Sequence, residues 1–167
     1  MTPAEIEGEL ERLHTAGFAW AMACCGRRRE EAEDVLQASY LKILDGHARF
    51  AGRSSFQSFL FGVIRRTAAE ERRRSAVRRL LLGSDAGGTH PDPAAPASEA
   101  APAERLALRA ALARLSRRQR EVLELVLSLC MTLQEAAETL SISVGSARVH
   151  YERGKRRLAA LLGGART

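Results

Sequence analysis

The sequence predicts an all-α protein in which two small helical domains are joined by a flexible linker. Apolar side chains recur at helical spacing in both halves of the chain, and the β-branched alternation typical of strands is missing. Helix-start signals recur as well, as Ser or Thr followed three residues later by Glu or Gln. Between the halves, residues 83–103 hold four of the five prolines and no aliphatic side chain larger than Ala, so we expect domains over residues 1–82 and 104–167.

The N-terminal domain is expected to be a helical bundle. A Thr-Pro-x-Glu capping box at Thr2 opens a helix that runs toward Cys24. Gly26 and the arginines that follow break the chain, and an amphipathic helix over residues 30–45 comes next. A third helix starts after Ser55 and turns from apolar to Arg-rich along its length. The apolar side chains expected on the buried faces of the second and third helices are Val35, Leu36, Tyr40, Ile43, Leu44, Phe56, Phe59, Leu60, Val63 and Ile64.

The C-terminal domain is expected to contain a helix-turn-helix. Helices are predicted over residues 103–114, from a capping box at Ser116, from a second box at Thr132 to Leu140, and over residues 144–161. A three-residue turn separates the last two helices, and the outer face of the final helix is basic, as suits a DNA major groove. The side chains expected to hold this helix pair together are Leu133, Ala136, Ala137, Leu140, Ile142, Ala147 and Tyr151.

The positive charge of the chain is unevenly placed. Its 167 residues include 26 Lys and Arg against 20 Asp and Glu, a net charge of +6 that favours a polyanionic partner. Residues 1–63 carry seven basic against nine acidic side chains, whereas residues 64–82 carry seven Arg against two Glu. Residues 147–158 carry five basic side chains against one acidic. Two basic clusters, one in each helical domain, indicate that each domain contacts a phosphate backbone. The alternative, that both clusters are only solvated helix faces, explains the pattern less well.

The sequence shows no pattern of a catalytic or metal site, so we expect neither an enzyme nor a bound cofactor. Cys24, Cys25 and Cys130 are expected to be buried thiols that pack as small hydrophobes. A redox or zinc role that two of them share with His14 is the less favoured alternative. No apolar run reaches the ~20 residues that span a bilayer, and the acidic N-terminus is unlike a signal peptide. We therefore expect a cytoplasmic protein without membrane insertion.

Several longer segments resemble one known family. LSRRQREVLEL and MTLQEAAETLSISVGSARVHYERGKRRL resemble region 4 of sigma-70 factors of the extracytoplasmic-function (ECF) type. AEDVLQASYLKIL and ARFAGRSSFQSFLFGVIRRTAAEERRR resemble region 2 of the same family. The resemblance implies a promoter-specificity factor that binds core RNA polymerase through its β′ clamp helices and β flap and recognises −10 and −35 promoter elements. Many members are held inactive by an anti-sigma factor, although no residue here identifies such a partner.

The resemblance also assigns roles to individual residues. Aromatic side chains three apart, as Phe56 and Phe59 are, also suit a helical core, which is the alternative for Phe59. The sequence departs from the family pattern at Ala38, where an acidic residue is frequent, and at Ser141, where Gly is usual. It departs again at Arg66, where Asn is common, and at His150, where Arg is common. The implied contacts are Asp34, Gln37 and Lys42 for polymerase, Arg53, Ser55, Phe59, Arg65, Arg66, Arg72, Arg73 and Arg74 for the −10 element, and Ser146, Arg148, His150, Arg153, Lys155 and Arg156 for the −35 element.

Two other functions are compatible with parts of the sequence. A stand-alone helix-turn-helix regulator would use only the C-terminal domain for DNA and would bind its operator tightly without polymerase. A degenerate sigma-like protein would act through protein contacts alone and support no promoter-dependent transcript. The resemblance of residues in the N-terminal domain to region 2 argues against the first of these alternatives.

Overall fold

The computed structural model describes residues 1–82 and 102–163, and these residues form two compact units. Most of the predicted linker, residues 83–103, lies outside the described residues, and its last two residues belong to the first helix of the second unit. Every regular element among the described residues is helical, which confirms the all-α prediction. No helix of the described residues is both long and apolar enough to cross a lipid bilayer.

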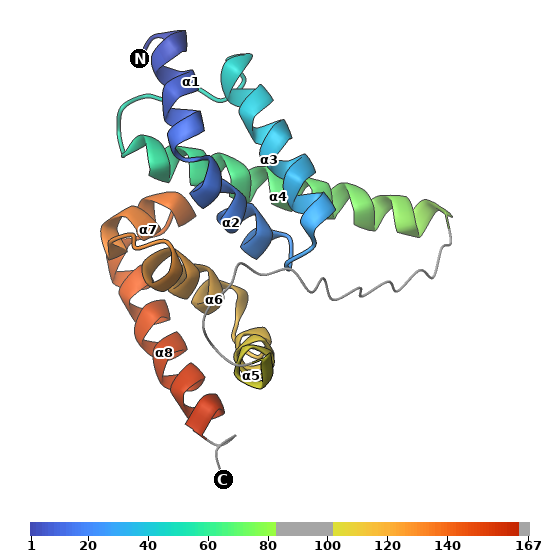
Figure 1. The fold of residues 1–167 in the computed structure, drawn as a ribbon, viewed down its shortest axis with the longest axis vertical. Helices are drawn as coiled ribbons and strands as arrows, with labels where there is room; N and C mark the ends of the chain where they lie inside the picture. The colour runs from blue at the N-terminus through green and yellow to red at the C-terminus, as the bar shows by residue number, and fades with distance from the viewer. Residues whose placement is uncertain (83–101, 164–167) are drawn as a thin grey trace. The chain divides into compact units, whose positions relative to one another are not determined.

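The first unit is a bundle of four helices (Figure 1). Its three inner helices pack against one another, and the last of them extends beyond the bundle. The predicted capping box at the start of the chain is present, because Thr2 and Glu5 exchange hydrogen bonds between side chain and backbone. The four helices are α1 (Pro3–Arg12), α2 (His14–Cys24), α3 (Arg29–Leu44) and α4 (Phe56–Leu82).

The single helix predicted from Thr2 toward Cys24 is wrong, because the chain turns at Leu13 and forms two helices. Leu13 leaves helical geometry with φ −93° and ψ 2°. Its side chain and that of Leu10 are both buried. The turn lets the acidic α1 and the apolar α2 follow different directions while both leucines stay in the core.

The core of the first unit is centred on an aromatic pair that joins α2 to α4. Trp20 and Phe61 are fully buried, and their rings stack with centroids 6.2 Å apart. The indole Nε1 of Trp20 also donates to the backbone oxygen of Phe61 at 3.0 Å, so the polar end of the ring is satisfied. Most of the predicted apolar stripe is buried around this pair, but Leu44 is exposed because α3 ends there and Ile43 takes the inward position.

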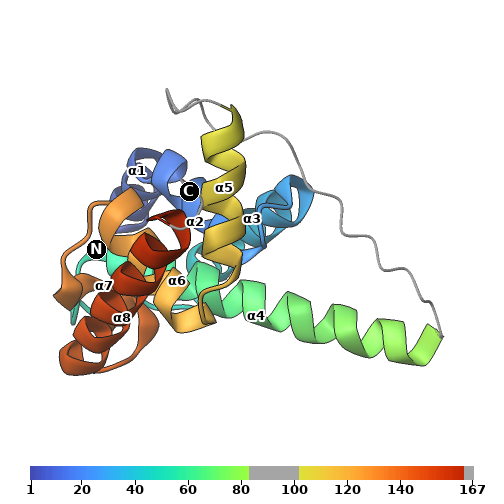
Figure 2. The ribbon, with the colours of Figure 1, turned by 90° about the horizontal axis from the view of Figure 1, so that it is seen from below.

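The described residues of the second unit form four α-helices and one turn of π-helix (Figure 2). The capping boxes predicted at Ser116 and Thr132 are both present. The helix predicted from the capping box at Ser116 changes to π-helical geometry after Leu123, so the expectation of one regular α-helix is wrong there. The elements are α5 (Pro102–Ala113), α6 (Arg117–Leu123), the π-helical η1 (Glu124–Ser128), α7 (Leu133–Leu140) and α8 (Val144–Gly163).

The predicted helix-turn-helix is formed by α7 and α8. Ser141 ends α7 in the left-handed conformation with φ 54°, so the turn is made without the glycine that usually occupies it. Leu140 and Ala147 are buried between the two helices, as predicted. Tyr151 is half-buried, and so are the other two large side chains of the predicted contact, Leu133 and Ile142.

The prediction that all three cysteines are buried thiols is wrong for one of them. Cys25 is buried, and this burial raises the pKa of its thiol to about 11. Cys24 is half-buried. Cys130 is exposed, because it follows η1 with φ 52° and the next residue, Met131, fills the buried position instead.

Candidate functional site

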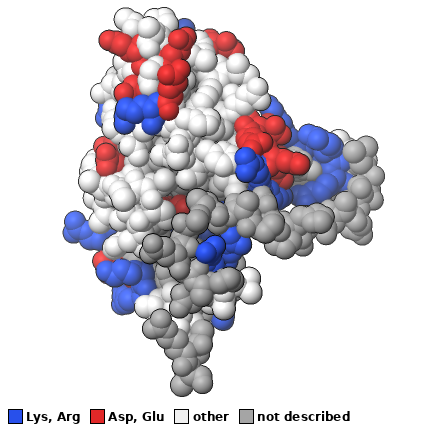
Figure 3. Space-filling model, viewed as in Figure 1, with Lys and Arg blue, Asp and Glu red and all other residues white. Residues whose placement is uncertain are grey.

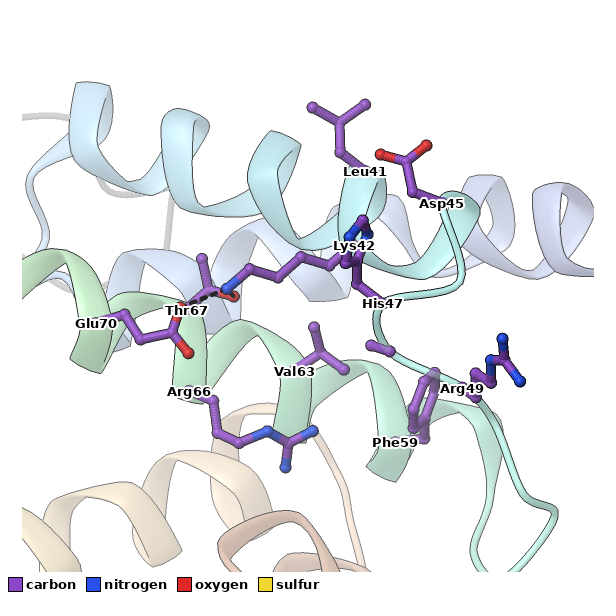
Figure 4. Close-up of a pocket in the computed structure, with 11 residues that line it drawn as sticks. Leu41, Lys42, Asp45, His47, Arg49, Phe59, Val63, Arg66, Thr67 and Glu70 are labelled. Atoms are coloured by element: carbon purple, nitrogen blue, oxygen red, sulfur yellow. Dashed lines mark hydrogen bonds and ion pairs between the residues drawn. The ribbon is translucent and has the colours of Figure 1, made fainter.

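A groove of about 640 Å³ lies between α3 and α4 in the first unit (Figure 4). The second half of α3 and the middle of α4 form its sides. The loop between these helices closes one end, and Gly46 starts this loop with φ 75°, a conformation that favours glycine. The residues that line the groove are Leu41, Lys42, Asp45, His47, Ala48, Arg49, Phe59, Val63, Arg66, Thr67 and Glu70.

One end of the groove is polar. The Nζ of Lys42 donates to Thr67 Oγ1 at 3.1 Å and to the Glu70 carboxylate at 2.5 Å, and Figure 4 shows the lysine side chain reaching from α3 to α4. The ion pair is about two-thirds buried, with Lys42 34% and Glu70 37% exposed. The hydrogen bond from Lys42 lowers the pKa of Glu70, so this carboxylate is ionised at neutral pH.

The other end of the groove is aromatic. The rings of Phe50, Phe56 and Phe59 form a cluster in which the centroids lie 5.4 to 5.7 Å apart. Phe56 is buried and anchors the cluster in the core. Phe59 is half-buried and lines the groove, so its ring serves both the core and the surface. Ser55 caps α4 by accepting from the Ser58 amide at 3.1 Å. The cap fixes the start of α4, and therefore the positions of Phe56 and Phe59 on this helix.

The arginines that the resemblance assigns to the −10 element differ in how free they are to meet DNA. Arg53, Arg66 and Arg73 are exposed, whereas Arg65 is half-buried. Arg74 is exposed and pairs with Glu71 at 2.7 Å. Arg72 is half-buried and donates from Nη1 to the Cys24 backbone oxygen at 2.7 Å, so it joins α4 to the end of α2. In Figure 3 basic side chains gather over the projecting end of α4, and acidic side chains gather over α1 and in a second patch beside that basic end.

The three residues assigned to polymerase binding do not share one face of α3. Asp34 and Gln37 are exposed. Lys42 instead points to α4 and belongs to the groove. Gln37 borders a second hollow of about 420 Å³ on the α2–α3 side of the bundle, and this hollow has a largely apolar lining. It is lined by His14, Phe18, Arg29, Glu33, Leu36, Gln37, Tyr40 and Leu41.

The basic helix of the second unit begins with a serine cap. Ser143 Oγ accepts from the Ser146 amide at 3.1 Å, and the two hydroxyls lie 2.9 Å apart. Lys155 is exposed and its Nζ lies 5.3 Å from the centre of the Tyr151 ring. Among the other residues assigned to the −35 element, His150 is half-buried and the rest are exposed, namely Ser146, Arg148, Arg153 and Arg156.

Sequence reasoning missed the residue that fixes how α8 crosses α6. Gly154 is buried, and a Cβ at this position would lie 3.1 Å from Leu123 Cδ1 and 3.2 Å from Gln119 Cβ. The absence of a side chain therefore permits the close approach of the two helices. The signal that could have revealed it is a lone glycine inside a strong helical pattern.

Family models of sigma-70 factors match both units. The model of sigma-70 region 2 matches residues 10–78, and the model of sigma-70 region 4 matches residues 105–158. The chain belongs to the sigma-70 family. Region 2 followed by region 4 is the arrangement expected from the ECF resemblance of the sequence segments.

Individual sigma factors resemble the chain over nearly its whole length. The RNA polymerase sigma factor CnrH of Cupriavidus metallidurans is 27% identical over 163 residues, which cover 93% of this chain and 85% of that protein. The sigma factor RpoE of Bartonella quintana, solved in complex with the anti-sigma factor NepR, matches with a TM-score of 0.74 and 22% identity over 95% of this chain and 97% of that one. CnrH, solved in complex with the cytosolic domain of CnrY, matches with a TM-score of 0.66 and 22% identity over 98% of this chain and 90% of that one.

The family defines the function. The chain is a promoter-specificity sigma factor, which binds core RNA polymerase and promoter DNA and directs transcription initiation. This confirms the function expected from the resemblance. A stand-alone helix-turn-helix regulator is not favoured, because the region 2 match covers most of the first unit.

Proposed function

We propose that residues 1–82 bind core polymerase and the −10 element, and that residues 104–167 bind the −35 element, with residues 83–103 as the tether. The polymerase supplies the nucleotide chemistry, so this chain contributes binding and positioning and is not itself an enzyme. It acts in the cytoplasm, where the polymerase is. Because the similar sigma factor RpoE has been solved with the anti-sigma factor NepR, a protein of that kind is also a proposed partner.

The polymerase-binding surface is proposed to be the exposed face of α3 with the hollow beside it. Asp34 and Gln37 supply charge and hydrogen-bonding groups at the rim, and the apolar lining of the hollow includes Phe18 and Leu41. A mainly apolar centre with a polar rim is the usual composition of a protein–protein interface. Lys42 is left out of this surface because its ammonium is bonded to α4.

The −10 site is proposed to be the groove between α3 and α4, and the observation that carries the assignment is its combination of an aromatic end with a polar end. A base that has left the DNA stack can place its face on the Phe59 ring, and such stacking contributes about 1–3 kcal/mol per base. Two exposed arginines, Arg66 in the groove and Arg53 in the loop before α4, can meet the phosphates on either side of that base. The gain offsets the few kcal/mol that unstacking costs.

The −35 site is proposed to be the exposed basic face of α8. The helix starts at its serine cap, so the Ser146 hydroxyl and the nearby backbone amides point to a phosphate. Arg148 lies two residues further along α8 and is exposed, as a side chain that reads base edges must be. Arg153, Lys155 and Arg156 add charge for the phosphate backbone.

Run-off transcription with the reconstituted holoenzyme tests these assignments. Promoters are first found by mapping start sites on a genomic library, and variants are then compared on one promoter with both elements. Arg148→Ala should lower initiation about 10-fold, the effect of losing one good base contact. Arg114→Ala is the control, because Arg114 is an exposed arginine of the second unit that lies outside α8. Equal activity of Arg148→Ala and wild type would show that the recognition face is misplaced.

The polymerase assignment has a separate readout. Asp34→Arg should weaken binding of the chain to core polymerase in a pull-down without DNA, since the change reverses charge at the proposed rim. Arg73→Ala changes an exposed charge elsewhere in the same unit and should leave that binding unchanged. A failure of the wild-type chain to associate with core polymerase would overturn the proposal as a whole.

A further inference from the structure

The side of α8 that points away from the rest of the second unit carries an exposed valine. Residues three or four apart lie on one side of a helix, because one turn holds 3.6 residues. The residues of this outward side, all of them exposed, are Gly145, Val149, Glu152 and Arg156. The buried residues of α8, Ala147 and Gly154, lie two and five residues from Val149 and therefore on the opposite side. Val149 is thus near the middle of the face that is proposed to enter the major groove.

Neither the packing of the unit nor phosphate binding explains this valine. Val149 is 45% exposed, so it adds little to the core. The exposed arginines beside it, Arg148 and Arg153, can bond to phosphate oxygens, whereas an aliphatic side chain has no group that can do so. Contact with another apolar group would remove its surface from water, which is favourable in proportion to the area buried. An apolar partner on the DNA would therefore explain its position.

The major groove presents one methyl group, the C5-methyl of thymine, among base edges that otherwise carry hydrogen-bond donors and acceptors. The side chain of Val149 is short, so it reaches a base edge only where the helix backbone comes close to the floor of the groove. Gly145 lies one turn before it and has no side chain, and it is exposed, so the outward face of α8 is low at this point. The start of α8 can therefore approach the base edges closely enough for Val149 to touch one.

We propose that Val149 contacts the C5-methyl group of a thymine in the −35 element and makes this chain prefer a T·A pair at one position. Cytosine at that position would place an amino group where thymine has a carbonyl and would lack the methyl group. Val149 acts beside Arg148, because a methyl contact and a hydrogen bond read different groups of the groove. The inference rests on the proposed −35 site and adds an apolar specificity residue to its polar contacts.

The experiment removes the methyl group from the DNA and leaves its hydrogen bonds in place. Deoxyuridine pairs with adenine as thymine does but has no C5-methyl. Each thymine of the −35 element, on either strand, is replaced in turn by deoxyuridine. The substituted and the natural promoter then compete for the reconstituted holoenzyme in one run-off reaction, in which they give transcripts of different lengths. With the wild-type chain, one position should favour the natural promoter about 4-fold, the effect of burying one methyl group.

The protein variants then decide which residue reads that methyl group. Val149→Ala removes both methyl groups of the side chain and should bring the ratio of the two transcripts close to one. Leu127→Ala is the matched control, because Leu127 is an aliphatic residue of the same unit that is 53% exposed and lies in η1, outside α8. It should keep the wild-type ratio. A ratio that stays near 4-fold in Val149→Ala would overturn the inference, and so would a −35 element that contains no T·A pair.

Arg148→Ala separates failure of this inference from failure of the proposed −35 site. If Arg148→Ala lowers initiation while every deoxyuridine promoter competes as well as the natural one, α8 reads the element without Val149, and this inference alone falls. If neither Arg148→Ala nor any deoxyuridine substitution changes initiation, α8 does not read the element, and both proposals fall. Thermal melting followed by circular dichroism shows that each variant is folded before it is compared, as the exposure of the substituted residues leads us to expect.

Discussion

The crossing of α6 and α8 at Gly154 gives the most direct test of how the second unit is held together. A Cβ on this residue would lie 3.1 Å from Leu123 Cδ1, 3.2 Å from Gln119 Cβ and 3.3 Å from Leu123 Cγ. Favourable contacts between carbon atoms begin near ~3.5 Å, so one methyl group already requires the helices to separate by a few tenths of an ångström. Gln119 Cβ is fixed to the backbone of α6 and Leu123 is buried, so neither side chain can simply swing away.

The magnitude follows from two opposed effects. Replacing glycine by a good helix former inside a helix gains about 1 kcal/mol. Overpacking a close-packed contact costs about 1–3 kcal/mol and sometimes more. Gly154→Ala should therefore be neutral or lose up to about 2 kcal/mol, whereas Gly154→Leu needs room for three more carbons with no larger helical gain and should lose about 3 kcal/mol. A domain of this size has only about 3–9 kcal/mol in total.

Urea unfolding followed by NMR measures this loss in each unit separately, because backbone amides report residue by residue. Gly154→Leu should lower the midpoint for residues of α6, α7 and α8 and leave the midpoint of α2 unchanged. The control is Gly145→Leu in the same helix, where the nearest atom to a Cβ is Ser143 Oγ at 3.9 Å and the residue is exposed. That variant should be as stable as wild type or more stable by up to about 1 kcal/mol, because it gains helix propensity without overpacking. Equal stability of Gly154→Leu and wild type would refute the reasoning.

Three further predictions concern single residues. Trp20→Phe should lower the free energy of unfolding of the first unit by about 2 kcal/mol in urea melts, because it removes the hydrogen bond to Phe61 and leaves unfilled volume; an unchanged midpoint would contradict this. In the native chain at pH 8, a chromogenic disulfide reagent should label Cys130 first, because Cys130 is exposed whereas burial raises the pKa of Cys25 to about 11. Cys130→Ser should abolish the fast phase of labelling, and persistence of that phase would show that another thiol is accessible. Ser141→Gly should raise the melting temperature of the second unit, with a gain of about 0.5–1 kcal/mol, because glycine adopts the positive φ of this turn without strain; a lower melting temperature would mean that the serine side chain supports the turn.

Local sequence signals predicted the start of several helices well. The capping boxes at Thr2, Ser116 and Thr132 all form, because a cap depends on residues three apart and on little else. Interruptions within helices were predicted poorly. The turn at Leu13 and the π-helical η1 lie in apolar stretches where continued helix is the natural expectation, and only packing against the rest of each unit interrupts it.

The candidate site was predicted in its composition but not in its grouping. The resemblance assigned Phe59 and Arg66 to DNA, and both line the groove. It placed Lys42 with the polymerase contacts, since Lys42 follows Asp34 and Gln37 on one helix. Glu70 was not predicted at all, because an acidic residue next to arginines on a helix ordinarily forms a solvated ion pair.

By itself, the sequence determined the all-α class, the family and the two basic clusters, because these depend on periodicity, on motifs and on counts of charge. Only the tertiary structure decided which charges face solvent and which join helices. Arg72 is bonded to the end of α2 while its neighbour Arg73 is exposed, and Lys42 is bonded to α4. The physical reason is that a long charged side chain turns toward whichever partner lies within reach. That partner is often on another helix, and the spacing of residues along the sequence does not show which helices pack together.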